Sequence, residues 1–165
     1  MQIPLVDLRA QYQTIKHEVM GAFEDVLEEM HLFLGPQNQA FEQEFAAYCG
    51  CRYAVGLSSG TDALALALRA CDVRLGDEVI TVANTFIATV KAIALVGARP
   101  VFVDVDPETY TMDCQQLEQV LTPRTRAIIP VHLYGQPVEM QPILAAAEAA
   151  LLKQEAQNVA VKLQV

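Results

Sequence analysis

A turn rich in serine and threonine carries the clearest chemistry in this sequence. The segment 58–64 reads SSGTDAL and lies between a short apolar run and a helical stretch of alanine and leucine. Unpaired N–H groups at a helix N-terminus carry partial positive charge, Gly60 lets the backbone approach a ligand closely, and the hydroxyl groups add donors. The turn is therefore suited to hold a phosphate group. The alternative is that Ser59 or Thr61 only caps the helix.

The same turn lacks the glycine motifs of the two common nucleotide-binding loops. It contains no Gly-x-Gly-x-x-Gly, and no Gly-Lys-Ser or Gly-Lys-Thr follows it. A dinucleotide-binding domain and a P-loop NTPase are both disfavoured for this reason.

Two further candidate sites each follow an apolar run that predicts a strand. Phe86, in the segment NTF at 84–86, could stack on a planar ring, although a phenylalanine at the start of a helix is more often part of the core. His132 and Tyr134 stand beside a glycine turn that follows the apolar run at 127–131. Ligands of open α/β sheets bind beyond the carboxyl ends of the strands, so either residue could contact one. The alternative for His132 is a hydrogen-bonded ring that packs against its loop.

Other polar clusters have simpler explanations. Asp104 and Asp106 look like paired carboxylates, but turn and capping hydrogen bonds before Pro107 account for them. The three histidines are scattered and the four cysteines lack the spacing of a zinc site, so we expect free thiols and no metal.

The elements that position these residues alternate along the chain. Apolar periodicity predicts helices at 8–30, 39–48, 62–70, 85–96, 113–121 and 143–157, and strands at 53–57, 78–82, 100–105, 127–131 and 158–165. Asp7 is the expected N-cap of the first helix and Gly50 the expected C-cap of the second. Nearly continuous apolar strands that alternate with helices predict an α/β fold, a mostly parallel sheet with helices on both faces.

Composition limits what this chain can do. With 165 residues, 53% of them hydrophobic, it can bury one core, and we expect a single α/β domain over 1–165 with N-terminal helices at 1–50 and a divergent tail at 143–165. A net charge of −9 disfavours binding to nucleic acid or to anionic lipid. No export signal or apolar stretch of spanning length occurs, which predicts a cytoplasmic chain with no membrane association.

Taken in order, eight short motifs resemble the DegT/DnrJ/EryC1/StrS family of pyridoxal-phosphate-dependent sugar aminotransferases. They are IPLVDL at 3–8, GP at 35–36, FEQEFA at 41–46, SGTDAL at 59–64, GDEVI at 76–80, NTFIAT at 84–89, GARPVFVDVD at 97–106 and VHLYGQP at 131–137. The resemblance covers the chain from Ile3 to about Ala147. It implies an incomplete fold-type-I transferase large domain, and a homodimer or other homo-oligomer with active sites at the subunit interface.

The resemblance also implies a cofactor and a reaction. Pyridoxal 5′-phosphate would be bound through the turn Gly60, Thr61 and Asp62, with Phe86 stacked on the pyridine ring and His132 and Tyr134 nearby on the substrate side. The implied reaction moves an amino group from glutamate to a keto group of a nucleotide-linked sugar, in polysaccharide or antibiotic-sugar biosynthesis.

The chain departs from the family pattern toward its end. The family's aspartate that contacts the pyridine nitrogen would fall in 158–165, which contains no Asp, and no lysine stands in the family's Schiff-base context. We therefore expect a chain truncated before the Schiff-base lysine, with no catalytic residue of its own and at best non-covalent cofactor binding. The alternative is a noncatalytic remnant that acts as an interaction or regulatory subunit.

Overall fold

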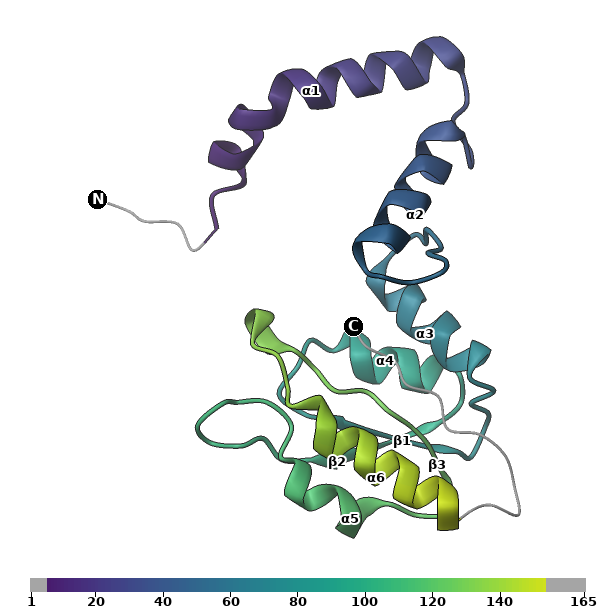
Figure 1. Ribbon diagram of the computed structural model, residues 1–165, viewed down its shortest axis with the longest axis vertical. Helices are drawn as coiled ribbons and strands as arrows, with labels where there is room; N and C mark the ends of the chain where they lie inside the picture. The colour runs from purple at the N-terminus through teal and green to yellow at the C-terminus, as the bar shows by residue number, and fades with distance from the viewer. Residues whose placement is uncertain (1–5, 154–165) are drawn as a thin grey trace. The chain divides into compact units, whose positions relative to one another are not determined.

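The computed structural model describes residues 6–153, which divide at Gly56 into two compact units. The first unit contains helices α1 (Leu8–Glu29) and α2 (Pro36–Tyr48) (Figure 1). Asp7 caps α1 as expected, because its carboxylate accepts hydrogen bonds from the N–H groups of Arg9 at 3.1 Å and Ala10 at 3.0 Å. No helix within 6–153 combines the length and the apolar character needed to span a bilayer.

Helix α2 starts earlier than expected and ends as expected. Its first residue is Pro36 rather than Gln39, because proline has the backbone angle that the first helical position requires and needs no N–H partner there. Gly50 follows its end with a φ of +65°, and the N–H of Cys51 donates to the carbonyl of Ala46 at 2.9 Å. This left-handed closure confirms the predicted C-cap.

The strand expected at 53–57 does not form. Tyr53 and Val55 are exposed, and among the described residues no strand lies beside this segment. The N–H of Gly56 donates instead to the carboxylate of Glu42 on α2 at 2.7 Å. A side chain therefore satisfies the backbone group that a strand ladder would have used.

The second unit is an α/β layer structure. Its elements are α3 (Gly60–Ala70), β1 (Glu78–Val82), α4 (Ala88–Leu95), β2 (Arg99–Val103), the short helices η1 (Cys114–Gln116) and α5 (Leu117–Val120), β3 (Thr125–Ile128), the turn η2 (Leu133–Gly135) and α6 (Met140–Lys153). The strands form a parallel sheet in the order β2-β1-β3. The further strand expected at 158–165 lies outside the described residues.

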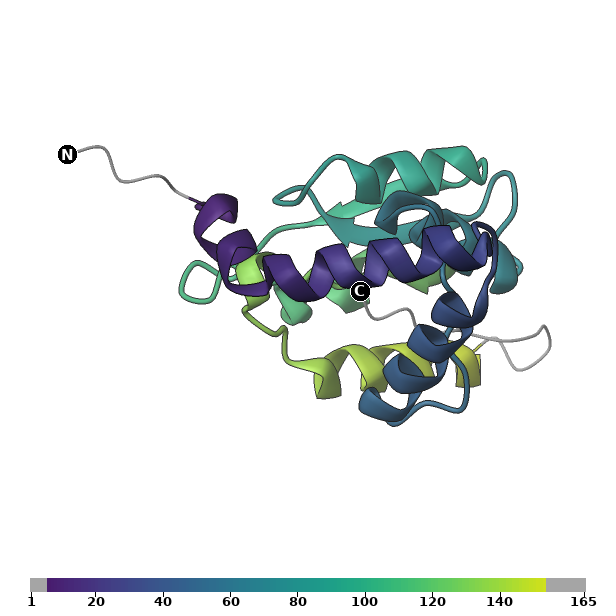
Figure 2. The ribbon, with the colours of Figure 1, turned by 90° about the horizontal axis from the view of Figure 1, so that it is seen from above.

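Helices cover both faces of this sheet, as predicted. Every residue of the central strand β1 is buried, and its side chains alternate between two cores. Val79 faces the core shared with α3 and α4, which includes Leu68 and Ile93. Ile80 faces the core that includes Leu117 of α5 and residues of α6. Figure 2 shows α4 and α6 on opposite sides of the strands.

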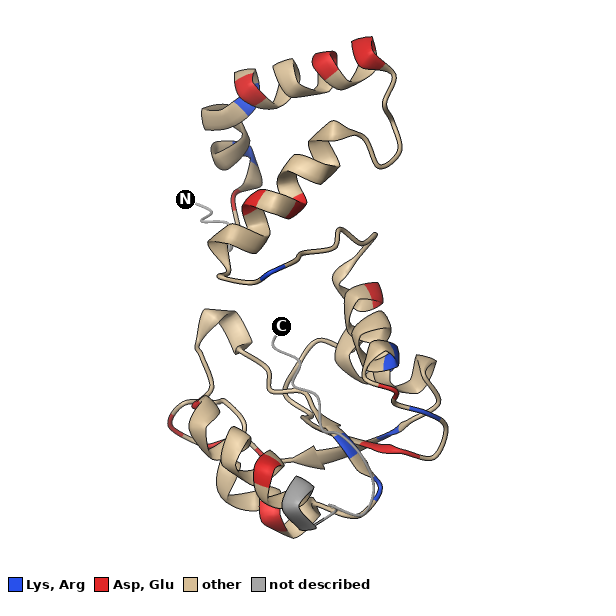
Figure 3. Cartoon of the chain, turned by 45° about the vertical axis from the view of Figure 1, so that its right-hand side comes forward, with Lys and Arg blue, Asp and Glu red and all other residues tan. Residues whose placement is uncertain are grey.

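The amino end of the sheet is fastened by a buried carboxylate. Glu78, the first residue of β1, is inaccessible to solvent and accepts hydrogen bonds from Thr122 at 2.7 Å, from Arg99, and from Arg124 at 2.7 Å. Acidic and basic positions meet at this end of the strands in Figure 3. The hydrogen bonds from Thr122 and Arg99 lower the pKa of Glu78 to about 2 despite its burial. The three groups thus join β1 to β2 and to the loop before β3.

Replacing this carboxylate is expected to weaken the fold in a pH-dependent way. In Glu78→Gln the free energy of unfolding at pH 7 should fall by about 2 kcal/mol, because hydrogen bonds to a charged acceptor are lost. The pKa of Glu78 is lowered in the folded chain, so its stabilisation is complete above about pH 4.5 and is lost as the pH falls toward 2. Urea unfolding between pH 7 and pH 2.5 measures both effects.

The matched control for this prediction is an exposed ion pair. Asp72 and Arg74 lie 2.6 Å apart with both side chains in solvent, so Asp72→Asn should change the free energy of unfolding by less than about 0.5 kcal/mol. An equal loss in Glu78→Gln and Asp72→Asn, or a Glu78→Gln curve parallel to that of the unmodified chain at low pH, would contradict the assigned role.

Candidate functional site

The serine- and threonine-rich turn forms the N-terminus of α3. Ser59 is the N-cap, with extended backbone, and its hydroxyl accepts a hydrogen bond from the N–H of Asp62 at 3.2 Å. The next N–H, of Ala63, donates to the carbonyl of Ser59 at 2.9 Å. Within 6–153 the N–H groups of Gly60 and Thr61 and the Thr61 hydroxyl have no protein acceptor. The turn therefore presents unpaired donors at the positive end of a helix.

The two serine hydroxyls of the turn are already engaged. Ser58 donates to a carboxylate oxygen of Asp62 at 2.6 Å, and Ser59 donates to the same oxygen at 2.8 Å. These two bonds, the Ser58 bond first, lower the pKa of Asp62 below its ordinary value. We expected the serine hydroxyls to add donors for a ligand; in the structure their protons point to Asp62 instead.

Beyond the carboxyl end of β1, the chain turns before α4 begins. The N–H of Thr85 donates to the carbonyl of Ala83 at 2.9 Å, so the helix expected from Thr85 starts only at Ala88. Phe86 lies in this turn and is 75% exposed, which excludes the buried-core interpretation for its ring. The hydroxyl of Thr85, in the turn, lies 3.4 Å from the hydroxyl of Thr89, in the first turn of α4.

Beyond β3, the chain leads to His132. The N–H of Ile129 donates to the carbonyl of Ile80 at 2.8 Å, which holds this exit beside β1. The Nδ1 atom of His132 accepts a hydrogen bond from the N–H of Val138 at 3.1 Å, so in the neutral ring the proton resides on Nε2. His132 thus makes a hydrogen bond within its own loop, which was one of the two expected interpretations. The N–H on Nε2 is still available to donate.

These three segments line one cavity of about 370 Å³. Gly60 and Thr61 come from the N-terminus of α3, Phe86 from the turn after β1, and His132 from the loop after β3. The cavity thus lies beyond the carboxyl ends of adjacent parallel strands, where open α/β sheets bind ligands, and its size suits one small molecule. A Cβ added at Gly60 would meet no atom within 4 Å, so the backbone there is open to a ligand.

Comparison with known proteins identifies the family of this chain. Residues 13–153 match the model of the DegT/DnrJ/EryC1/StrS aminotransferase family. The chain belongs to this family. A UDP-N-acetyl-3-dehydro-alpha-D-glucosamine 3-aminotransferase of Acidithiobacillus ferrooxidans is 49% identical over 88% of this chain and 40% of its own length. A Geobacillus stearothermophilus relative named pleiotropic regulatory protein is 45% identical over 90% of this chain and 40% of its own length.

Solved structures share the fold of this chain. S. venezuelae DesV superimposes with a TM-score of 0.90 at 39% identity, over 99% of this chain and 42% of its own. Bacillus subtilis NtdA, solved with its cofactor pyridoxamine phosphate, gives 0.88 at 30% identity, over 99% of this chain and 36% of its own. The fold is thus part of a fold-type-I aminotransferase domain. The chain spans about 40% of the length of the curated relatives it matches.

Two of the expected site residues do not line the cavity. Asp62 bonds back to the serines, as described above. Tyr134 is fully exposed and has a φ of +53°, a left-handed conformation that non-glycine residues rarely adopt, immediately before Gly135 at +81°. A substrate-side role for Tyr134 stays a prediction.

The cavity also contains residues beyond those we expected. Leu64, one turn after Gly60 on α3, and the paired residues Thr85 and Thr89 all line it. The helical spacing of four residues from Gly60 to Leu64 is the signal that could have indicated Leu64. Thr85 is next to Phe86 in the sequence, which is the signal that could have indicated it.

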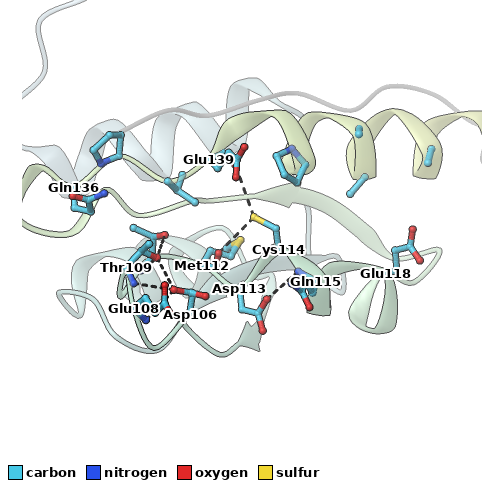
Figure 4. A pocket seen from close by; sticks show the side chains of 17 residues that line it. Asp106, Glu108, Thr109, Met112, Asp113, Cys114, Gln115, Glu118, Gln136 and Glu139 are labelled. Carbon is cyan, nitrogen blue, oxygen red and sulfur yellow. Dashed lines mark hydrogen bonds between the residues drawn. The ribbon is translucent and has the colours of Figure 1, made fainter.

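A larger hollow, of about 990 Å³, lies between the segment 106–118 and α6 (Figure 4). One of its carboxylates is engaged locally: Asp106 accepts hydrogen bonds from the N–H groups of Thr109 at 2.8 Å and Glu108 at 3.0 Å, which lower its pKa. The turn interpretation of Asp106 is therefore confirmed. Burial raises the pKa of the Cys114 thiol, and its Sγ lies 3.8 Å from the carbonyl of Glu139. No cluster of potential metal ligands occurs within 6–153.

Proposed function

We propose that this chain provides the phosphate and ring contacts for pyridoxal phosphate in a transaminase acting on keto groups of nucleotide-linked sugars. The observation that carries the proposal is a cavity lined both by Gly60 and Thr61, whose N–H groups are unpaired, and by Phe86, whose ring is exposed. Family membership and relatives solved with pyridoxamine phosphate or pyridoxal phosphate support the choice of ligand.

The residues of the cavity fit such a ligand. A phosphate group would accept hydrogen bonds from the N–H groups of Gly60 and Thr61 and from the Thr61 hydroxyl, at the positive end of α3. Phe86 would cover one face of the ring and exclude water from it. His132 would hold a proton on Nε2 at the edge of the cavity, available to an acceptor on the ligand. When bound, pyridoxal phosphate supplies the electron sink that amino-group exchange requires.

The sugar class is inferred from the relatives. Two relatives are named for a UDP-linked and a dTDP-linked sugar, and another, 50% identical over 65% of this chain, is named GDP-perosamine synthase. We infer a nucleotide-linked keto sugar as acceptor and glutamate as amino donor, with a homo-oligomer as the assembly. Light scattering of the purified chain tests the assembly.

The second candidate is a noncatalytic interaction or regulatory subunit that pairs with a longer family member. One observation favours it: a relative that is 45% identical over 90% of this chain is named for regulation. None of the four lysines among these 165 residues stands in the family's Schiff-base context, and we infer that these residues bind the cofactor without a covalent bond.

Borohydride trapping tests the cofactor site and whether the cofactor is bound covalently. The chain is incubated with pyridoxal phosphate, reduced and mapped by peptide mass spectrometry, and pyridoxamine phosphate binding is measured by calorimetry in parallel. Binding that inorganic phosphate displaces, without stoichiometric labelling of a lysine, is the result we expect. Stoichiometric labelling of one lysine would favour the complete enzyme, and absence of any binding would overturn the proposed cofactor site.

A further inference from the structure

The hydrogen bonds around Asp62 form a closed ring at the start of α3. One carboxylate oxygen of Asp62 accepts from the hydroxyls of both Ser58 and Ser59, at 2.6 and 2.8 Å. The hydroxyl of Ser59 in turn accepts from the N–H of Asp62 at 3.2 Å. The Asp62 side chain, three residues after the N-cap Ser59, therefore holds the two residues that precede the helix. The bond from the Asp62 N–H to the Ser59 hydroxyl is one half of a capping box, and the carboxylate accepts from the serine hydroxyls in place of the N-cap N–H.

This ring encloses the two residues whose N–H groups are unpaired. Gly60 and Thr61 lie between the tied positions 59 and 62, and both line the cavity, whereas Ser58, Ser59 and Asp62 do not. A carboxylate in this position is also a poor neighbour for an anion, because like charges repel. Its presence beside a phosphate cradle needs a reason other than contact with the phosphate.

We propose that Asp62 is a positioning residue, which fixes the turn so that Gly60 and Thr61 present their N–H groups to the phosphate, and which withholds both serine hydroxyls from it. The inference rests on the proposed cofactor site and changes the role expected for Asp62 within it. The phosphate donors are then three: two backbone N–H groups and the Thr61 hydroxyl.

Two substitutions of Asp62 separate its role as a hydrogen-bond acceptor from the effect of its charge. An asparagine can accept both serine hydroxyl bonds through its amide oxygen but carries no charge, and an alanine can do neither. Asp62→Asn and Asp62→Ala remove the same charge, so any difference between them reports on the ring of hydrogen bonds alone.

The test measures pyridoxamine phosphate binding to the 165-residue chain by calorimetry. This ligand has no aldehyde, so it cannot label lysines. Asp62→Ala should bind it about tenfold more weakly than Asp62→Asn, the effect of losing one to two hydrogen bonds that order the cradle. Asp62→Asn should bind within about threefold of the unmodified chain, or more tightly. Ser58→Ala should weaken binding about threefold, and Ser58→Thr should restore it.

Pyridoxamine, which lacks the phosphate, is the control ligand. Its affinity should be the same in Asp62→Asn and Asp62→Ala, because the inferred role concerns only the phosphate; an equal loss for both ligands would indicate general unfolding and overturn the inference. Equal affinities of the two variants for pyridoxamine phosphate would also overturn the inference. If both variants bound it equally and more weakly than the unmodified chain, Asp62 would be in direct contact with the ligand.

A second measurement distinguishes failure of this inference from failure of the proposed function. Hydrogen exchange at the N–H of Asp62, which donates to Ser59, should be faster in Asp62→Ala than in Asp62→Asn. If the unmodified chain does not bind pyridoxamine phosphate, the proposed function fails together with the phosphate role of Asp62. If it binds and the two variants do not differ in affinity or exchange, only the positioning role fails.

Discussion

Phe86→Ala is expected to weaken binding of pyridoxamine phosphate by about 30-fold, or about 2 kcal/mol. The ring is 75% exposed and lines the cavity, so it contributes little to folding and has its face free for a ligand. Removing an aromatic ring that stacks on a planar heterocycle costs about 1 to 3 kcal/mol. Calorimetric titration of the purified variant measures the effect.

The neighbouring residue provides the control for this change. Ile87 is apolar, 65% exposed and absent from the cavity lining. Ile87→Ala should therefore leave the affinity within about twofold of the unmodified chain. Equal affinities in Phe86→Ala and Ile87→Ala would show that the ring does not contact the ligand.

Leu68→Ala is expected to lower the free energy of unfolding by about 3 kcal/mol. Leu68 is inaccessible to solvent, in the core where α3 packs against the sheet, and truncating such a side chain leaves a cavity as well as losing apolar burial. Chemical denaturation monitored by circular dichroism gives the value. Because the same helix presents Gly60 and Thr61 to the cavity, cofactor affinity should fall only where the variant is partly unfolded.

Leu66 on the same helix is the control for the core prediction. It is 48% exposed, so Leu66→Ala removes the same atoms from a position that folding does not enclose. Its free energy of unfolding should change by less than about 0.5 kcal/mol. Similar losses at both positions would mean that α3 does not pack as described.

The sequence predicted the central part of the fold well. The strand at Glu78–Val82 has its predicted bounds, because the β-branched apolar residues Val79, Ile80 and Val82 follow directly after the turn at 75–77. The strand expected at 53–57 has a similar signal but no neighbour among the described residues, and Glu42 takes up the N–H of Gly56. The apolar residues of a segment indicate that it can be buried. Whether it forms a strand also depends on a neighbouring strand to pair with, which the pattern within that one segment does not reveal.

The candidate site could be predicted only in outline. Position after a strand correctly indicated Phe86 and His132, and position at a helix N-terminus indicated Gly60 and Thr61; all four line one cavity. The hydroxyl directions of Ser58 and Ser59 could not be foreseen, because each could equally have faced a ligand; the Asp62 carboxylate decides between these alternatives through bonds of 2.6 and 2.8 Å.

The two ends of the central strand β1 have different roles. Glu78 anchors β1 at its amino end, and the ligand cavity opens past its carboxyl end, roughly 13 Å farther along at about 3.3 Å per residue. Substitutions at such a distance generally combine additively. Residues that line the cavity can therefore be substituted, in evolution or by design, without weakening the hydrogen bonds of Glu78 that hold the strands together.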